Sequence, residues 1–326
     1  TVVETETAMN EVSLSDLALD TLWASTAAWD LIKANAMAVG KFAAGRAGLS
    51  GYDYADIDAV ATSQTAMDAV STSETAMDAV STSETAMDAV SSSTLAMDAI
   101  WDSQEVAWAA VRDLAMAVGK FVAGRAGLEP QDYADIDAVS TSQTAMDAVS
   151  TSSTAMDAVS TSSTAMDAVS ASNTAVTSVA GSPLGLSEFF KSSYLTSSFW
   201  PSSAASAFWQ YNNDVTVNDG DNQYGGPALF LPVGTSDVAS WDIDLDQLSQ
   251  ISVTDRTTDY RSSDNEFQVR LGGNTLYSTT DNYTSYQTNS FDVSAESGTQ
   301  TLELLISGSS TSGEGDTLVS DITASA

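Results

Sequence analysis

The sequence predicts an elongated, mainly helical repeat region followed by a C-terminal all-β jelly-roll sandwich. Two observations carry this prediction. A ten-residue pattern runs from residue 7 to about residue 179 and stops at a stretch containing Gly and Pro, residues 181–185. From about residue 186 onward, short apolar runs alternate with polar residues and turn signals, as in antiparallel strands.

The ten-residue pattern, called the decad below, reads x-Ala-Φ-Asp-Ala-Φ-Ser-x-Ser-x, where Φ is apolar. Ala and Met favour helix, and two Φ residues three positions apart share one helical face. Degenerate copies extend from Met9 to Phe42. The apolar pairs of the clearest copies are Met67/Val70, Met77/Val80, Met87/Val90, Met97/Ile100, Met146/Val149, Met156/Val159 and Met166/Val169.

A ten-residue period does not fit a straight, continuous helix. At about 100° per residue, one decad falls about 80° short of three turns, so the apolar stripe would drift around the helix. We therefore expect a steep left-handed supercoil, or helices broken where Ser-x-Ser competes for backbone hydrogen bonds. One helix cannot bury this face alone, which favours a multi-chain bundle, in the first place a homotrimer. A solenoid with one rung per decad and a disordered chain are the alternatives.

A longer unit is repeated on top of the decads. Ala36–Phe42 (AMAVGKF) recurs as Ala115–Phe121, and Tyr54–Val60 (YADIDAV) recurs as Tyr133–Val139, each 79 positions later. Such duplication is typical of a spacer that sets length. The predicted segments are an N-terminal stalk or attachment segment (1–54), a first decad array (55–100), a second copy of an aromatic and basic node (101–133), a second decad array (134–182) and a β-sandwich tip (183–326).

The C-terminal part predicts eight or so antiparallel strands, the number expected of a sandwich or jelly roll. Gly272 and Gly273 mark a hairpin turn between two of them. The expected strands are Ala228–Val233, Trp241–Leu245, Ile251–Thr254, Glu266–Leu271, Asn274–Ser278, Thr288–Val293, Thr301–Ile306 and Leu318–Ile322.

Composition excludes several classes of function. The chain carries 44 acidic and 10 basic residues, a formal charge of -34, which argues against nucleic-acid binding because phosphate contacts need clustered Lys and Arg. It has no Cys and no His, so triad hydrolase chemistry, disulfides and the usual zinc sites are absent. No apolar run approaches the length of about 20 residues that a membrane helix needs, so we expect no membrane insertion.

Acidity spread along the whole chain keeps a protein soluble where salt screens the charges. The scarcity of Lys resembles that of proteins from extremely halophilic archaea or their viruses, whereas an ordinary acidic surface protein is the alternative. We expect the melting temperature to fall at low salt, because the Debye length grows from about 3 Å at 1 M to about 30 Å at 0.01 M. A melting temperature that is constant over this range would contradict the halophile interpretation.

The two copies of GKFxAGRAGL, at Gly40–Leu49 and Gly119–Leu128, concentrate basic residues. One interpretation is an anion site formed by Lys41, Arg46, Lys120 and Arg125. The sequence favours another, a small hydrophobic node whose basic residues pair with neighbouring acids, because the motif lacks the spacing of a phosphate loop.

Aromatic residues in the C-terminal part are candidate ligand contacts, because flat rings near polar loops suit the faces of sugars. The acidic turns NDGDN and GEGD are candidate calcium sites, since calcium prefers oxygen ligands. A plain acidic turn is the alternative for both. The candidate ligand-binding residues are Tyr283, Tyr286, Trp209, Tyr224 and Trp241, and the candidate metal ligands are Asp219, Asp221, Asn222, Glu314 and Asp316.

Two parts of the chain resemble known families. TAMDAVSTSETAMDAV (65–80) and its neighbours resemble the decad repeats of tail-fibre proteins of phages and haloarchaeal tailed viruses. WDIDLDQLSQISV (241–253), EFQVRLGGNTLYS (266–278), NSFDVSAESGTQTLELLIS (289–307) and EGDTLVSDI (314–322) resemble the galactose-binding-like and carbohydrate-binding-module jelly rolls.

The resemblance implies a receptor-binding tail fibre that is part of the virion and attaches to a halophilic host. The implied partners are further copies of the chain, virion tail or baseplate proteins, and a host surface glycan or glycoprotein. The alternatives are a cell-surface adhesin or S-layer-associated fibre, and a polysaccharide-depolymerising tip. The small β-domain offers no large loops for a catalytic cleft, so we expect no enzyme.

Overall fold

The computed structural model describes residues 2–192, 216–218, 228–231, 238–246, 248–257, 266–280, 285–307 and 317–325. The chain forms two compact units, Thr1–Val139 with Ser162–Ala165, and Ser140–Thr161 with Met166–Ala326. The helices are α1 (Glu6–Ser13), α2 (Asp16–Trp23), α3 (Thr26–Lys33), α4 (Ala36–Arg46), α5 (Ile57–Ala61), α6 (Gln64–Ser71), α7 (Glu74–Ser81), α8 (Glu84–Ser91), α9 (Thr94–Asp102), α10 (Ala109–Arg112), α11 (Ala115–Arg125), α12 (Ile136–Thr141), α13 (Gln143–Ser150), α14 (Ser153–Ser160), α15 (Ser163–Ala171), α16 (Asn173–Ala180) and α17 (Pro183–Lys191). Short helical segments lie at η1 (Val2–Glu4), η2 (Gly51–Asp53), η3 (Gln104–Trp108) and η4 (Pro130–Asp132).

Serine sets the start of each regular decad helix. In α9, the backbone N–H of Ala96 donates to Oγ of Ser93 at 3.3 Å, which caps the N-terminus. The same cap recurs one decad earlier, where Ala86 donates to Ser83 at 3.1 Å. The expected continuous, supercoiled helix is wrong, because each Ser-x-Ser stretch ends one short helix and caps the next.

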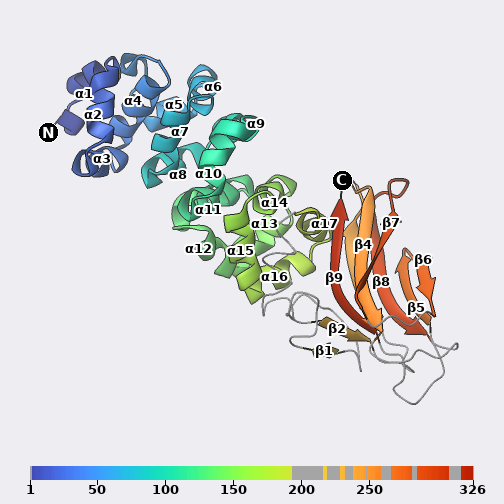
Figure 1. Cartoon of the computed structure of the whole chain (residues 1–326). Helices are drawn as coiled ribbons and strands as arrows, with labels where there is room; N and C mark the ends of the chain where they lie inside the picture. The colour runs from blue at the N-terminus through green and yellow to red at the C-terminus, as the bar shows by residue number, and fades with distance from the viewer. Residues whose placement is uncertain are drawn as a thin grey trace. The chain divides into compact units, whose positions relative to one another are not determined.

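The capping hydroxyl also joins successive turns. Oγ of Ser93 donates to the carbonyl oxygen of Ala61 at 2.7 Å, 32 residues earlier, and Oγ of Ser103 donates to that of Ser71 at 2.7 Å. In the second unit, Ser172 donates in the same way to Ser140 at 2.6 Å. A separation of 32 residues is three decads and two residues, so each helix packs on the third helix along the chain, as α4 on α7, α6 on α9 and α13 on α16 (Figure 1).

The apolar residues of the decads face the interior of this stack. Met67, Val70, Met77 and Val80 are all 0% exposed within the single chain. Each such side chain contributes about 1.5–3 kcal/mol by burial. The helical prediction is confirmed, in the form of the solenoid alternative. Burial of Met and Val therefore gives no reason for a trimer, which stays a prediction.

The periodic helices run one decad further than the boundary predicted at residue 183. Ser182 caps α17, Pro183 occupies its first turn, where its fixed φ is favourable, and Oγ of Ser182 donates to the carbonyl of Ser150 at 2.5 Å. Gly185 takes the place of the decad alanine, where a Cβ would lie 2.9 Å from the Ser150 oxygen. The Pro and Gly residues thus continue the helical stack instead of ending it.

The carboxyl of Glu188 on α17 is 7% exposed and makes stability depend on pH. Burial raises its pKa from 4.5 to about 7, Lys191 at 2.7 Å opposes this shift, and Asp157 on α14 adds to it. The folded chain therefore binds a proton that the unfolded chain has released, so the free energy of unfolding falls as pH rises from about 4.5 to 7. Glu188→Gln should lack this component.

We expect the melting temperature of the wild type, relative to that of Glu188→Gln, to decrease steadily as the pH rises from about 4.5 to 7. Thermal unfolding of both proteins across this pH range measures the difference. A difference that is independent of pH would contradict the assignment.

The C-terminal part is a sandwich of two antiparallel sheets (Figure 1). The five-stranded sheet has the order β1-β2-β9-β4-β7 and the four-stranded sheet the order β3-β8-β5-β6. Each predicted strand coincides with an observed one, and β1 is additional. The strands are β1 (Thr216–Asn218), β2 (Ala228–Leu231), β3 (Val238–Asp244), β4 (Gln250–Thr257), β5 (Glu266–Leu271), β6 (Asn274–Thr279), β7 (Gln287–Asp292), β8 (Thr299–Ser307) and β9 (Thr317–Ser325).

Alternate residues of both sheets form the core between them. Ile251 and Val253 of β4 and Phe267 and Val269 of β5 are all 0% exposed. The predicted hairpin joins β5 and β6 through Gly272 and Gly273, whose φ angles of 55° and 81° favour glycine. Within the described residues, every helix is too short or too polar to cross a membrane.

Candidate functional site

The outer face of the five-stranded sheet presents a set of polar side chains. In β4, Ile251 and Val253 point into the core, so the alternation of a strand places Ser252, Thr254 and Arg256 on the opposite face. The sequence ISVT (251–254) encodes this directly, since Ile251 and Val253 occupy one phase and Ser252 and Thr254 the other.

Neighbouring strands add a second and a third column to this face. Ser252 pairs with Ser290 of β7 and Thr323 of β9, and Thr254 pairs with Thr288 and Asp321. The hydroxyls of Ser252 and Ser290 lie 2.8 Å apart, and those of Thr254 and Thr288 lie 2.9 Å apart.

Burial varies along this face. Thr254 and Asp321 are 2% and 3% exposed, and the threonine hydroxyl donates to Oδ1 of Asp321 at 3.1 Å. Ser290 and Thr288 on the edge strand are exposed. The set therefore has a fixed polar base flanked by accessible hydroxyls.

An aromatic ring and a cation lie at one end of the set. Tyr286 immediately precedes β7 and is half-buried, and the guanidinium carbon of Arg256 lies 5.2 Å from the centre of its ring. This stacking holds both groups in place. We name Ser252, Thr254, Arg256, Tyr286, Thr288, Ser290, Asp321 and Thr323 the outer-face set.

Hydroxyl, carboxylate, guanidinium and phenol groups together can donate and accept many hydrogen bonds beside a flat ring. Such a surface matches a sugar, whose hydroxyls need both donors and acceptors and whose apolar face packs on aromatic rings.

Comparisons with known proteins give weak likenesses. No protein-family model and no curated protein matches the chain. Among solved structures, the CBM36-1 domain of a multidomain xylanase from the hindgut metagenome of Trinervitermes trinervoides has a TM-score of 0.27 and 15% identity, covering 36% of this chain and 90% of that one.

Two further solved structures have similar values. A CBM36 in complex with calcium and xylotriose has a TM-score of 0.26 and 20% identity, covering 36% of this chain and 93% of that one. TmCBM61 in complex with beta-1,4-galactotriose has a TM-score of 0.28 and 14% identity, covering 36% and 86%. Values this low carry no argument about the ligand of this chain, and the sandwich is established by its own strand register.

The predicted ligand contacts separate into three groups. Tyr286 belongs to the outer-face set. Trp241, predicted as a ligand contact, is 2% exposed in β3, because its phase points into the core. Trp209, Tyr224 and Tyr283 lie outside the described residues.

The predicted calcium ligands Asp219, Asp221, Asn222, Glu314 and Asp316 also lie outside the described residues, so calcium stays a prediction. Where the structure is described, no group of three or more acidic side chains is arranged to hold a metal ion.

The basic residues of the two GKFxAGRAGL copies are internal. Nζ of Lys41 donates to the carbonyls of Gly51 and Tyr54 at 2.8 and 2.9 Å, and that of Lys120 donates to Asp88 at 2.6 Å. Both lysines are 0% exposed. Arg46 and Arg125 pair with Asp20 and Asp98, each at 2.7 Å. The interpretation as a hydrophobic node with paired charges is confirmed, and an anion site here is wrong because the cations are already satisfied.

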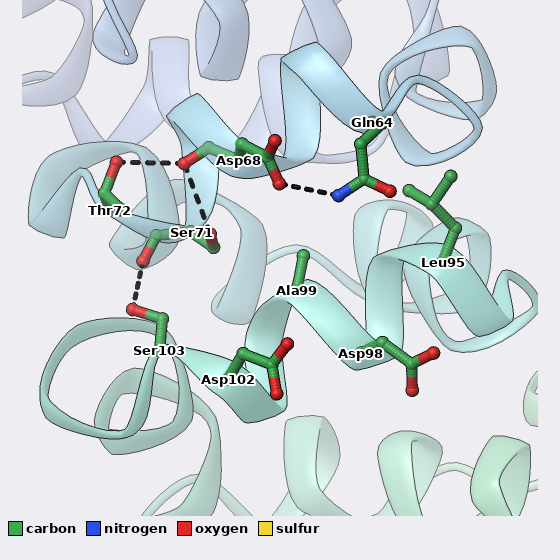
Figure 2. A pocket seen from close by; sticks show the side chains of 9 residues that line it. All are labelled: Gln64, Asp68, Ser71, Thr72, Leu95, Asp98, Ala99, Asp102 and Ser103. Carbon is green, nitrogen blue, oxygen red and sulfur yellow. Dashed lines mark hydrogen bonds between the residues drawn. The ribbon is translucent and has the colours of Figure 1, made fainter.

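A hollow of about 780 Å³ lies between α6 and α9 (Figure 2). Gln64 turns toward Asp68 and donates to its Oδ1 at 2.6 Å, and Ala99 of α9 lies nearby. The duplicated unit has Ser178 where the first has Ala99, and this serine donates to Asp147 at 2.9 Å and accepts from Gln143 at 2.8 Å. Ala99 offers no such hydroxyl, so the Gln64–Asp68 pair lacks this third partner.

Proposed function

We propose that the chain is a binding protein whose β-sandwich recognises a surface carbohydrate through the outer-face set. The observation that supports this is the combination of Tyr286 with hydroxyls, a carboxylate and a guanidinium on one sheet face. Loops and exposed faces on a rigid scaffold are where recognition usually sits. The decad helices repeat one surface many times, so they suit a spacer better than a selective site.

In its fuller form, the proposal is an extracellular attachment fibre of a virus that infects a halophilic host. The decad solenoid would set the distance between the particle and the binding domain, with tail or baseplate proteins as partners at the other end. Several weak sites on one particle would raise avidity without new contacts. The repeat pattern, the duplication and the formal charge of -34 support this form.

The test is binding of the purified full chain to a panel of neutral and acidic oligosaccharides in about 1 M NaCl. Tyr286→Ala should weaken binding about tenfold or more, because it removes the aromatic surface. Tyr52→Ala is the matched control, since Tyr52 is an exposed tyrosine, 53% accessible, in the decad region. No binding to any sugar, or equal loss in both variants, would refute the proposal.

A further inference from the structure

Among the residues that the structure describes, Arg256 is a cation without a carboxylate partner. Among the basic residues that the structure describes, it is the one with neither an ion pair nor a hydrogen bond. Its Nε is buried and unpaired. Its partner in the described structure is the ring of Tyr286.

The other described cations show how unusual this is. Arg270, on the four-stranded sheet, donates its Nε to Gln268 at 2.9 Å. The remaining ones each have a carboxylate within 4.0 Å: Lys33 with Asp30, Lys41 with Glu6, Arg46 with Asp20, Arg112 with Asp113, Lys120 with Asp88, Arg125 with Asp98 and Lys191 with Glu188. In a chain with 44 acidic residues, a described cation that is paired with no carboxylate is the exception.

The surroundings of Arg256 favour a ligand that carries a carboxylate. A guanidinium presents its N–H groups in a planar fork that binds both oxygens of a carboxylate, and stacking on a ring leaves the edge of the fork available. Two pairs of hydroxyls follow on the same face, Thr254 with Thr288 and Ser252 with Ser290, two residues apart along β4.

Resting on the proposed function, we infer that the outer-face set selects an acidic sugar, a uronic acid unit whose carboxylate binds Arg256. Tyr286 then supports the guanidinium and packs on the sugar ring. The exposed hydroxyls of Thr288 and Ser290 bind the hydroxyls of the same or the next unit. Arg256 is thus the residue that determines specificity, and Tyr286 supplies affinity for any sugar.

The net charge of -34 repels an acidic sugar at long range. This repulsion is screened beyond about 10 Å at 0.1 M salt and about 3 Å at 1 M, whereas a contact at hydrogen-bond distance is screened much less. Two carboxylates near Arg256 have partners of their own: Asp321 accepts from Thr254 at 3.1 Å, and Asp255, on the opposite face of β4, accepts from Asn289 at 3.1 Å. The test therefore belongs at about 1 M NaCl.

The experiment measures the affinity of the full chain for a galacturonic acid tetrasaccharide and for the neutral galactose tetrasaccharide of the same linkage. We expect the acidic sugar to bind about tenfold more tightly, the effect of one charge-assisted contact. Arg256→Gln should abolish this preference, because it lowers the affinity for the acidic sugar about tenfold more than the affinity for the neutral one. Arg270→Gln, the same change on the other sheet, should keep the preference.

The outcomes separate the two proposals. Equal binding of both sugars by the wild type, or equal loss of both affinities in Arg256→Gln, would overturn the inference and leave carbohydrate binding standing. Tighter binding of a sulfated galactose tetrasaccharide than of the galacturonic acid form would overturn the assignment to a carboxylate. Failure of every sugar to bind would refute the proposed function itself.

Discussion

Replacing Gly119 with alanine is expected to lower the free energy of unfolding by about 3 kcal/mol or more. Gly119 lies in α11, where an added Cβ would overlap the backbone carbon of Asp135 and the backbone nitrogen of Ile136. Backbone atoms cannot turn aside as a flexible side chain can, so the helix and the chain at Asp135 must separate. Chemical denaturation of the full chain measures the effect.

Gly181→Ala is the matched control for this variant. Its added Cβ would meet its nearest atoms, the carbonyl oxygens of Thr177 and Ser178, at 3.4 and 3.6 Å, which are ordinary contacts. The control should unfold within about 1 kcal/mol of the wild type, on either side. Equal stability of Gly119→Ala and the wild type would show that α11 does not pack on the chain at Asp135 as described.

Replacing Ser83 with alanine is expected to cost about 2–3 kcal/mol, because one hydroxyl has two functions. It accepts from the N–H of Ala86 at 3.1 Å and donates to the carbonyl of Lys33 at 2.6 Å, and the residue is 0% exposed. The alanine variant therefore loses a helix cap and removes the hydroxyl that donates to the partly buried carbonyl of Lys33. Unfolding in denaturant measures this loss of stability, and an unchanged m value shows that the variant unfolds in the same two-state transition as the wild type.

Ser15→Ala provides the comparison for Ser83→Ala. Ser15 caps α2 by accepting from Ala18 at 3.3 Å, but it is exposed, and within the described residues its hydroxyl makes no hydrogen bond to another turn. We expect this variant to lose only the cap, about 0.5–1 kcal/mol. Similar losses at the two serines would mean that the bond between turns contributes nothing, and the account of the solenoid would fail.

The repeat predicted helices correctly but not their arrangement. Met67 and Val70 identify an apolar face, and the sequence cannot say whether another chain or another turn covers it. The structure decides this through Ser93 and Ser103, whose hydroxyls reach carbonyls 32 residues earlier. Ser is common both in caps and in disordered segments, so composition alone leaves that choice open.

In the β-domain, local alternation is sufficient to locate the strands. The end of the helical region is not predicted correctly from Pro183 and Gly185, because α17 continues the stack through contacts of Ser182 and Gly185 with Ser150, which only the structure shows. Tyr286 could be found as an aromatic residue near a polar loop. Arg256 could not be found from the sequence. It is a candidate because no described carboxylate pairs with it, and this can be seen only from the register of β4, β7 and β9.

We propose that recognition lies on the outer face of the five-stranded sheet. Hydrogen–deuterium exchange of the full chain is measured with and without the tetrasaccharide of highest affinity. Exchange should slow in residues 250–257 and 285–292, which carry the outer-face residues of β4 and β7, and stay unchanged in the decad helices. Slower exchange confined to the decad helices, with the two β segments unaffected, would contradict it.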